Sequence, residues 1–593
     1  MCGLAAFLSH SGAVDRDALI RSRDAMASRG PDGAGLWLSA DGAVGLAHRR
    51  LSIIDLSESG AQPMASGDET LRIVFNGEIY NYRELRAECE AAGQVFRSGT
   101  DTEVLLALYR RLGIAMLDRL VGMFAFVLWD EARRGLLLAR DPFGIKPLYL
   151  AESGGGLKVA SQVKALLAGG GIDTAPDSAG HVGFFLWGHV PEPHTLYRGI
   201  RALKAGTWLW AGQDGERHEG RFFDLAAELA GARCDNATDS AERLRAALAA
   251  SVRRHLIADV PVGVFLSGGL DSTTLLALAA SAASAPVRSV TLGFAEFAGG
   301  ARDEVPMAEA VAAAYGTDHV TSRIAAADFA AAKEAILAAM DQPSVDGVNT
   351  WLVARAAKER GLKVALSGLG GDELFAGYDS FTRIPRLAGL SAPRPLGRLA
   401  RLASQGWIGR FTSPKMAGLL EYGGSWGGAT LLSRGLYMPW ELAQVLDPDL
   451  ARDGWKRLAP VATLDGLVAG IASPRLKVSA LEMAGYMRNQ LLRDADWAGM
   501  AHGIEIRVPL VDIELFRALL PLLAGPNPPS KRDMANAARP PLPDAVLNRP
   551  KTGFFVPITQ WLGQPNLRSW AKAVHAAAAS FNFPVVVRRR AKV

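Results

Sequence analysis

The sequence predicts a two-domain protein of class α/β and α+β, in which two sheets packed face to face precede a parallel sheet covered by helices. The chain has 593 residues, more than one hydrophobic core usually organises. Up to about residue 210 it carries short apolar runs between turn residues, and from about residue 240 apolar runs alternate with Ala-rich helical stretches. The first pattern is typical of packed sheets, and the second of a parallel sheet.

The short apolar runs of the first half are expected to be buried strands, because Gly, Asp or Asn bounds them. They are Leu71–Phe75, Met123–Trp129, Leu136–Ala139 and Leu148–Ala151, with helices expected over Tyr82–Ala92 and Thr102–Leu112. The polar segment Ala211–Gly220 is interpreted as a boundary or a connecting turn. We therefore expect a first domain at 1–215 and a linker at 216–238.

The second half, expected at 239–575, alternates strands and helices at the spacing of a parallel sheet. The expected strands are Val262–Leu266, Val287–Phe294 and Leu362–Leu366, and the expected helices are Thr273–Ala283 and Val305–Tyr315. In such a sheet, ligands bind at the carboxyl ends of the strands. Residues 576–593, Ala-rich and then basic, are expected to be a flexible tail.

The bulk composition excludes several classes of protein. Apolar residues make up 49% of the chain and charged residues 21%, which is ordinary for a soluble globular protein. A net charge of +5 indicates no nucleic-acid partner, and the absence of a long apolar run indicates no membrane partner. No secretory signal is visible, and the three cysteines, Cys2, Cys89 and Cys234, form no disulfide framework. We expect a cytoplasmic protein.

Cys2 is a candidate nucleophile. Removal of Met1 would leave Cys2 with a free α-amine, which titrates at about 7.7–8.0 and can act as the base for the thiol of the same residue. A cysteine at position two is incidental more often than functional, so this feature depends on what accompanies it.

Three later segments supply groups that match glutamine. Arg50 can bind its carboxylate through a bidentate pair. Glu78 and Asp101 can bind its ammonium group. The Asn76 side chain and the Gly77 N–H can form an oxyanion hole. Each segment alone also has an ordinary explanation, as a turn, a helix cap or a surface cation.

Taken in this order after Cys2, the segments resemble the class II glutamine amidotransferase family of N-terminal nucleophile hydrolases. The string Arg140–Tyr149 adds to the match and is expected to shape the fold near the domain interface. The resemblance implies an αββα sandwich and catalysis by Cys2, Asn76 and Gly77. It implies glutamine binding by Arg50, Leu51, Ser52, Ile53, Ile54, Asn76, Gly77, Glu78 and Asp101.

The string Phe265–Ser272 lies between an apolar strand and a helix and has the sequence Phe-Leu-Ser-Gly-Gly-Leu-Asp-Ser. Its glycines allow close approach of a phosphate, and the helix N-terminus offers unpaired N–H groups. Ser267 and Ser272 can donate to phosphate oxygens, and Asp271 can bind Mg²⁺. The string resembles the loop of enzymes that split ATP into AMP and pyrophosphate, and it lacks the Gly-Lys-Ser/Thr of a P-loop.

Two further strings point to the same site. Leu366–Phe375 again follows a strand, and we expect Asp372 to join Asp271 at the metal. Arg549–Phe554 places Lys551 where it can neutralise charge on a departing pyrophosphate, although alone it would be a surface turn.

All these strings together look like the glutamine-hydrolysing asparagine synthetase family, from Cys2 to about residue 565. Asp259–Gly263 and Met500–Leu510 belong to the match. The resemblance implies a glutaminase domain, a synthetase domain that forms an acyl-adenylate with Mg²⁺ and ATP, and an internal route for ammonia. The implied ATP site is Leu266, Ser267, Gly268, Gly269, Leu270, Asp271, Ser272, Phe294, Ser367, Gly368 and Lys551. A homodimer is common in this family.

One position departs from the family pattern. Asparagine synthetases commonly carry Glu where this chain has Leu369, and leucine cannot accept a proton from the attacking amine. Leu369 is expected at the site of the acceptor and the adenylate. Aspartate is the first choice of acceptor, and the alternative is another carboxylate, such as a sugar acid in polysaccharide biosynthesis.

Two other classes share part of this pattern. A tRNA-modifying enzyme can carry the Ser-Gly-Gly-x-Asp-Ser loop, but it needs a basic surface and usually a reactive cysteine in the ATP domain. A regulatory protein without activity would retain the fold. A glutaminase and pyrophosphate-release assay separates these alternatives.

Overall fold

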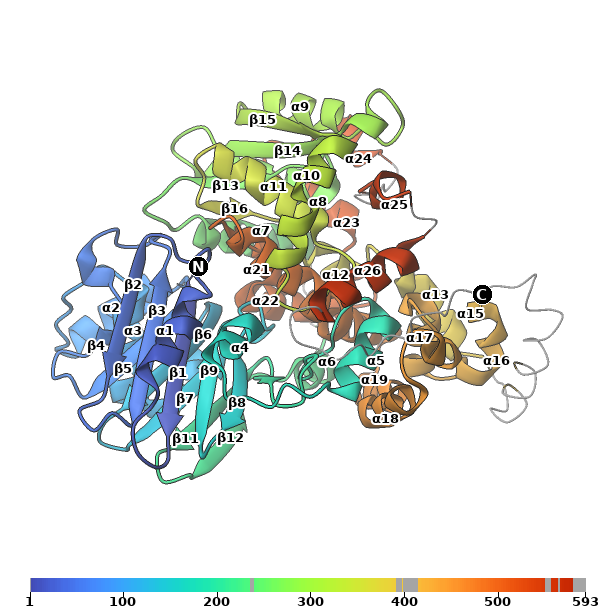
Figure 1. Ribbon diagram of the computed structural model, residues 1–593. Helices are drawn as coiled ribbons and strands as arrows, with labels where there is room; N and C mark the ends of the chain where they lie inside the picture. The colour runs from blue at the N-terminus through green and yellow to red at the C-terminus, as the bar shows by residue number, and fades with distance from the viewer. Residues whose placement is uncertain are drawn as a thin grey trace.

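The computed structural model describes residues 2–234, 239–390, 397, 401, 414–549, 556–563 and 566–579. Two domains pack side by side, with the first domain in blue and cyan at the left of Figure 1 and the parallel sheet of the second domain at the top. No helix among the described residues is long and apolar enough to cross a membrane.

The first domain contains two six-stranded antiparallel sheets, as predicted. The first sheet has the order β10 (Arg201–Ala202), β8 (Tyr149–Ser153), β9 (Gly156–Ala160), β1 (Gly3–Ser9), β3 (Val44–Arg50) and β2 (Gly33–Leu38). The second has the order β12 (Arg217–Arg221), β11 (Thr207–Gly212), β7 (Gly135–Arg140), β6 (Gly122–Asp130), β5 (Leu71–Ile79) and β4 (Met64–Ala65).

Side-chain alternation along the strands produces the αββα layers. In β1, Leu4 and Ala6 belong to the apolar core between the sheets, whereas Phe7 belongs to the core under the outer helices. The helices on this side are α1 (Arg16–Asp24) and α4 (Val163–Gly169), and those on the second sheet are α2 (Tyr82–Ala91) and α3 (Asp101–Leu112). The predicted αββα sandwich is confirmed.

Two predicted boundaries move. Strand β5 runs to Ile79, so Asn76–Glu78 lie inside the strand because they pair with Met123–Ala125 of β6. The segment predicted as a boundary forms the hairpin of β11 and β12, and residue 215 lies in its turn. The predicted linker also contains α6 (Leu225–Gly231), whose apolar face is buried in the core of the second domain.

The second domain is built on a five-stranded sheet in which every strand pair is parallel. Its order is β15 (Asp318–Ile324), β14 (Arg288–Phe294), β13 (Val262–Phe265), β16 (Val364–Leu366) and β17 (Glu505–Arg507). Helices α7 (Ser240–His255), α8 (Leu270–Ala282), α9 (Val305–Ala314), α10 (Ala326–Ala339) and α11 (Val348–Glu359) occur among these strands. The predicted strands and helices of this region are confirmed to within a few residues.

The remaining chain is largely helical. It includes α12 (Gly371–Leu374), α13 (Ser380–Ala388), α15 (Pro414–Ala417), α16 (Leu419–Tyr422), α17 (Trp426–Arg434), α18 (Pro448–Leu458), α19 (Pro460–Val468), α20 (Pro474–Glu482), a π-helical segment (Met483–Leu492), α21 (Arg493–Met500), α22 (Ile513–Leu523), α23 (Lys531–Asn536), α24 (Asp544–Leu547), α25 (Ile558–Trp561) and α26 (Leu567–Ala579). Helices α21 and α22 lie between the sheet and the first domain, whereas α15–α18 lie at the lower right of Figure 1. Helix α26 extends into the predicted tail, and residues 580–593 lie outside the described residues.

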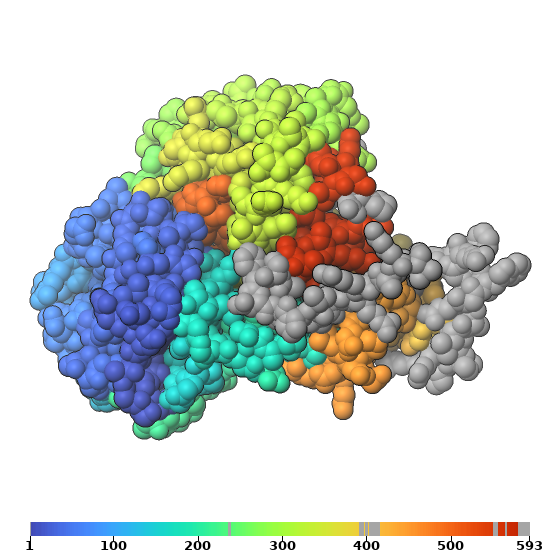
Figure 2. Space-filling view, viewed as in Figure 1, coloured from blue at the N-terminus to red at the C-terminus, as the bar shows by residue number. Residues whose placement is uncertain are grey.

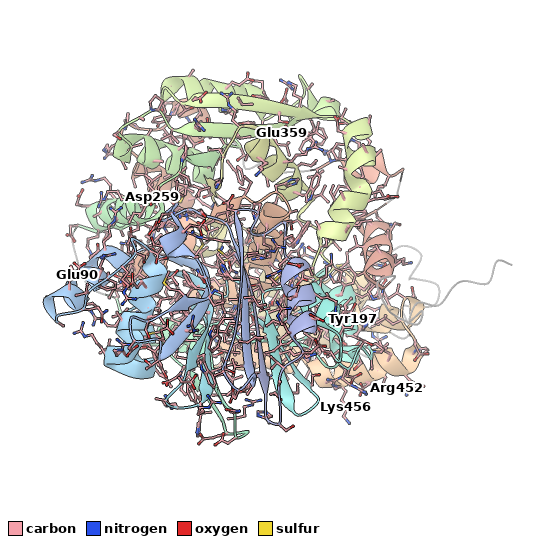
Figure 3. All side chains as sticks on the ribbon, turned by 60° about the vertical axis from the view of Figure 1, so that its left-hand side comes forward. Glu90, Tyr197, Asp259, Glu359, Arg452 and Lys456 are labelled. Carbon is pink, nitrogen blue, oxygen red and sulfur yellow. The ribbon has the colours of Figure 1, made fainter. Side chains whose placement is uncertain are left out.

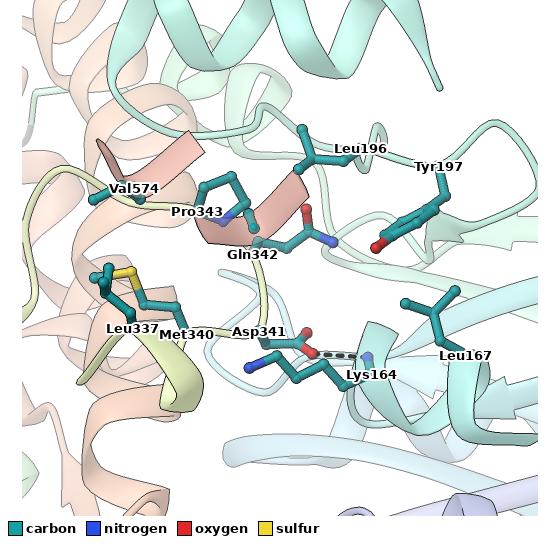
Figure 4. A pocket seen from close by; sticks show the side chains of 11 residues that line it. Lys164, Leu167, Leu196, Tyr197, Leu337, Met340, Asp341, Gln342, Pro343 and Val574 are labelled. Carbon is teal, nitrogen blue, oxygen red and sulfur yellow. Dashed lines mark hydrogen bonds between the residues drawn. The ribbon is translucent and has the colours of Figure 1, made fainter. Parts of the chain in front are cut away.

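The two domains share a buried interface. Figure 2 shows the cyan part of the first domain in contact with segments coloured yellow-green, orange and red. Asp341 of the second domain caps α4 of the first, since its Oδ2 and Oδ1 accept from Val163 N and Lys164 N, each at 3.0 Å (Figure 4). The two domains are therefore held in one orientation by polar as well as apolar contacts.

Candidate active sites

Cys2 lies immediately before β1 and is 9% exposed. Its backbone nitrogen donates to Asn76 Oδ1 at 2.9 Å, and its Sγ lies 3.9 Å from the Leu51 carbonyl oxygen. Burial raises the pKa of the Cys2 thiol above its ordinary value. A thiol with a raised pKa needs a base close by, and the nitrogen of the same residue is held in place by Asn76.

Asn76 and Gly77 are the residues that the sequence predicts for an oxyanion hole. Asn76 is fully buried, and its Nδ2 has no hydrogen-bond partner among the described residues. A buried amide donor without a partner is costly unless a ligand completes it. A Cβ on Gly77 would lie 2.1 Å from the Met123 carbonyl oxygen, so the pairing with β6 alone already requires glycine there.

Arg50 and the four buried residues after it, at the end of β3, form a wall next to Cys2. Arg50 ends the strand, and its Nη1 donates to the Ser57 carbonyl at 2.7 Å. Leu51, Ser52, Ile53 and Ile54 are all buried. The second domain supports this wall, because Asp259 Oδ2 accepts from Asp55 N at 2.8 Å; Asp259 lies near the junction of the domains in Figure 3.

Glu78 and Asp101, the predicted ammonium ligands, are both buried close to Glu505. Burial and the charge of Glu505 raise the pKa of Asp101 to about 6, and the same two causes raise the pKa of Glu78 well above its ordinary value. Asp101 is the first residue of α3, directly after the N-cap residue Thr100. The segment therefore caps a helix and also supplies the predicted carboxylate. Two carboxyls with raised pKa favour a bound cation.

Sequence reasoning missed that the second domain completes this site. Asp496 of α21 pairs with Arg29 (Nη1–Oδ2 2.6 Å and Nη2–Oδ1 3.0 Å), and Arg29 Nε donates to the Cys2 carbonyl at 3.0 Å. Arg507 of β17 lies 3.3 Å from Glu78 Oε2 and donates to Glu505 Oε1 at 2.6 Å. In the sequence, Glu505 and Arg507 were noted only as members of the Met500–Leu510 string. No sequence pattern indicated a role for Asp496.

The predicted phosphate loop connects β13 to the N-terminus of α8. Ser267 Oγ and Ser272 Oγ lie 3.0 Å apart, and Ser272 Oγ accepts from Ser267 N at 3.1 Å. Gly269 is the N-cap residue and Leu270 the first residue of α8, with no side chain capping the helix. The N-terminus of this thirteen-residue helix therefore faces the loop without a side-chain cap, an arrangement that suits a phosphate.

The second string meets this loop at the carboxyl end of β16. A Cβ on Gly368 would lie 2.8 Å from Asp271 Cβ, so only glycine allows the two loops to come this close. Leu266, Ser267, Asp271, Ser272, Ser367, Gly368, Leu369 and Asp372 line one cavity of about 270 Å³. The structure thus brings together most of the predicted ATP and metal residues.

A lysine that the sequence did not single out lies between the two predicted metal ligands. Lys531 Nζ lies 2.9 Å from Asp372 Oδ1 and contacts both carboxylate oxygens of Asp271. Lys531 is the first residue of α23, where the helix dipole disfavours a cation. A lysine at this unfavourable position was the one feature of the sequence that could have indicated its role. Lys551 lies outside the described residues. Two carboxylates that converge on a cation fit Mg²⁺ as a ligand set.

Three of the predicted ATP residues, Gly269, Leu270 and Phe294, do not line this cavity. Phe294 lies in a cluster of aromatic side chains. Phe294 ends β14, and its ring packs against Phe297 and Trp561 at centroid distances of 5.8 and 5.6 Å. The cavity is also lined by residues that the sequence did not predict, including Asn349 and Thr350.

Leu369 shares the cavity with a buried carboxyl. Glu373 is fully buried; its Oε1 accepts from Tyr378 Oη at 3.0 Å, and its Oε2 has no partner among the described residues. Burial, followed by the charge of Asp372, raises the pKa of Glu373 to about 7. A carboxyl of this pKa can exchange a proton near neutral pH, which Leu369 cannot do.

A larger cavity of about 820 Å³ lies near the first, and Arg434 connects the two. The guanidinium of Arg434 stacks on Tyr378, which lines the first cavity, at 4.6 Å, and on Tyr486, which lines the second, at 4.5 Å. Lys415 and Arg488 also line the second cavity and form no ion pair among the described residues. The second cavity therefore combines apolar walls with these two cations and with the carboxylates of Glu192, Asp346 and Glu482.

The fold and the two sites define a class of protein: an N-terminal nucleophile glutamine amidotransferase joined to a parallel-sheet ligase. A family model described as a glutamine amidotransferase domain matches residues 1–223, and one described as asparagine synthase matches residues 243–591. The chain belongs to the asparagine synthase family.

Curated relatives agree with this assignment. A putative glutamine-hydrolysing asparagine synthetase of Mycobacterium tuberculosis H37Rv is 37% identical, over 97% of this chain and 90% of that protein. Asparagine synthetase 1 (glutamine-hydrolysing) of Bacillus subtilis 168 is 33% identical over the same shares. A Gibberella zeae protein named Amidase chry2 is 32% identical, over 64% of this chain and 60% of that protein.

Proposed function

We propose that this protein synthesises asparagine with glutamine as nitrogen donor. Glutamine is hydrolysed to glutamate and ammonia in the first domain. In the second domain ATP adenylates the side-chain carboxylate of aspartate and releases pyrophosphate, and ammonia then displaces AMP to form asparagine. Support comes from the family membership, the relatives named asparagine synthetase, and the coexistence of both sites in one chain.

The residues around Cys2 account for the glutaminase half. With Met1 removed, the α-amine of Cys2 takes the thiol proton, and Sγ attacks the side-chain amide of glutamine. Asn76 Nδ2, buried without a partner, and Gly77 N donate to the oxyanion. The protonated amine gives its proton to the departing nitrogen, and water then releases glutamate from the thioester. Arg50, Glu78 and Asp101 orient the substrate.

The second domain accounts for activation of the acceptor. The N-terminus of α8, Ser267 and Ser272 hold the phosphates of ATP, and Asp271 with Asp372 would hold Mg²⁺. When bound, Mg²⁺ supplies charge neutralisation for the pyrophosphate leaving group. Lys531, already between the two carboxylates, carries a second positive charge to the same place.

The observation that carries the proposal is the buried Cys2–Asn76 pair in one domain together with two strand-end loops that converge on a cation in the other. The test supplies glutamine, ATP, Mg²⁺ and aspartate and quantifies glutamate, asparagine, AMP and pyrophosphate. Cys2→Ala should lose glutamate formation and keep asparagine formation from free ammonia. Stoichiometric ADP, or normal glutaminase activity in the variant, would refute the assignment.

A second acceptor class has its own support. Leu369 replaces a carboxylate in the cavity that holds the predicted ATP loop, and the neighbouring cavity of about 820 Å³ has room for a ligand of drug size. Trp187 and Tyr486 give this second cavity aromatic faces, and Asn489 and Gln490 give it amides. A sugar acid fits such a lining. Hexuronate-dependent AMP release that exceeds aspartate-dependent release would favour this alternative.

We also propose that the substrates are small molecules only, that the enzyme works in the cytoplasm and that it forms a homodimer. Light scattering after size exclusion tests the oligomeric state. A monomeric mass at micromolar concentration would contradict the dimer.

A further inference from the structure

A cavity of about 200 Å³ lies where α4 of the first domain meets the end of α10 and the helix α26 of the second (Figure 4). It shares no lining residue with the ATP cavity or with the cavity of about 820 Å³. Its walls are mainly apolar and include Leu167, Leu196, Leu337, Met340, Pro343 and Val574. An apolar cavity of about 150 Å³ can hold a benzene-sized molecule, so this one has room for a small ligand.

Gln342 places a polar group without a partner in this cavity. The residue is 1% exposed, and neither its Oε1 nor its Nε2 has a hydrogen-bond partner among the described residues. In Figure 4 its amide extends toward the side of the cavity formed by Leu196 and Tyr197. A buried donor or acceptor without a partner destabilises the fold, and this side chain has both. Two such atoms in an apolar cavity indicate that a ligand completes them.

The charged residues at the edge of the cavity already have partners. Both carboxylate oxygens of Asp341 accept from backbone N–H groups of α4, and Lys164 Nζ donates to the Ala338 carbonyl. Burial, followed by the charge of Asp341, raises the pKa of Tyr197 to about 12, so its hydroxyl stays neutral. The cavity therefore favours an uncharged ligand over an ion.

The chemistry of a glutamine side chain restricts what can pair with it. The carboxamide of Gln342 offers an acceptor oxygen and an NH₂ donor in one plane. A primary carboxamide on a ligand is its complement, because its N–H donates to Oε1 while its carbonyl oxygen accepts from Nε2. A carboxylate or a ketone accepts only and leaves Oε1 unpaired. A buried water needs about 2–4 polar partners, and the apolar walls offer few beyond this amide.

We propose that this cavity binds a small molecule through a primary carboxamide, with Gln342 as the recognition residue and the apolar walls around the body of the ligand. Two sources share this chemistry: an uncharged carboxamide with an apolar body, and an amino-acid carboxamide such as glutamine or asparagine. The walls favour the first. Because both domains line the cavity, a bound ligand stabilises their contact. Neither half-reaction of the proposed function requires this site.

The first test titrates benzamide into the full chain by isothermal calorimetry and compares it with acetophenone. The two probes have the same size and shape, but acetophenone lacks the N–H donors. Benzamide should bind at least about tenfold more tightly, because the ketone leaves Oε1 of Gln342 unpaired. L-Glutamine and L-asparagine are titrated in the same way. Binding of either that exceeds the binding of benzamide and requires Gln342 identifies an amino acid as the source, and weaker binding identifies the uncharged carboxamide.

Gln342→Met keeps the length of the side chain and removes both polar atoms. The variant should bind benzamide at least about tenfold more weakly than the wild type. Without ligand its Tm should be about 2 °C higher or more, because the unpaired atoms are gone. Persistent glutamate formation shows that the variant is folded.

Gln162→Met is the matched control. Gln162 is also a buried glutamine and precedes α4, but it does not line the cavity. This variant should bind benzamide with the Kd of the wild type. If Gln342→Met does not fold, Gln342→Asn keeps the carboxamide but withdraws it by one carbon. It should weaken the binding of benzamide and keep the preference over acetophenone.

Two results would overturn the proposal. One is a Kd for benzamide within twofold of that for acetophenone, together with no Gln342-dependent binding of either amino acid. The other is a Gln342→Met variant that binds every carboxamide as the wild type does. In either case a raised Tm of Gln342→Met would show that the glutamine is completed by water rather than by a carboxamide.

Discussion

Lys531→Met should make the stability of the synthetase domain depend on Mg²⁺. Lys531 holds Asp271 and Asp372 together, with its Nζ 2.9 Å from Asp372 Oδ1. Without the ammonium group, the two carboxylates face each other with no cation between them. The variant should therefore be less stable in EDTA, and it should regain stability when Mg²⁺ binds the same oxygens.

The magnitude follows from the burial of the three groups. Breaking a fully buried ion pair costs about 3–5 kcal/mol, and an exposed pair contributes about 0–1 kcal/mol. The lysine is 16% exposed and the two aspartates 24% and 20%, so this cluster lies closer to the buried limit. We expect a loss of about 2–3 kcal/mol in free energy of unfolding, which corresponds to a fall in Tm of about 5 °C or more.

The assay is thermal unfolding in EDTA and in saturating Mg²⁺, with ammonia-dependent AMP formation measured in parallel. Mg²⁺ should raise the Tm of Lys531→Met more than that of the wild type, because in the wild type the metal competes with the lysine. Arg532→Met, one residue along the same helix and exposed, is the control and should behave as the wild type. Equal Tm values in EDTA for wild type and Lys531→Met would refute the reasoning.

Three further predictions test other residues. Asn76→Ala should lower kcat for glutamine hydrolysis by about 10²–10³-fold and spare synthesis from ammonia; a loss below tenfold would exclude Asn76 as an oxyanion donor. Asp101→Asn should raise KM for glutamine. It should also stabilise the protein at pH 8 relative to pH 4, because the raised pKa of about 6 means that the wild type loses up to about 3 kcal/mol as pH rises from about 4 through about 6; an equal Tm difference at both pH values would contradict this. Leu369→Glu should speed aspartate-dependent asparagine formation from ammonia, and a fall in rate would show that the leucine serves the natural acceptor.

The sequence was most informative where local pattern and chemistry coincide. Short apolar runs predicted the two sheets, since burial on both faces leaves a strand such as β6 almost continuously apolar. The Ser267–Ser272 string predicted its own place between β13 and α8, because a glycine turn before a helix has few alternatives. The sequence pattern did not predict strand β17, because three residues are too few to show the alternation of a strand.

Residues that act across long chain separations were beyond sequence reasoning. Lys531 reaches Asp271 from 260 positions away, and Asp496 reaches Arg29 from 467 positions away. No composition, spacing or period records such a pair, because each partner is locally an ordinary charged residue on a helix or loop. The sequence placed Phe294 correctly at a strand end, but only the structure shows that its ring packs against Trp561.

By itself the sequence predicted the two-domain order, a candidate nucleophile, a candidate phosphate loop and the departure at Leu369, since each of these is a property of contiguous residues. Only the tertiary structure decided that Asp496 and Arg507 of the second domain lie against Arg29 and Glu78 of the first, and that Lys531 joins the two acidic loops. The physical reason is that burial of charge is settled by the whole fold. A buried guanidinium or ammonium group is stable only beside the carboxylates that folding brings to it.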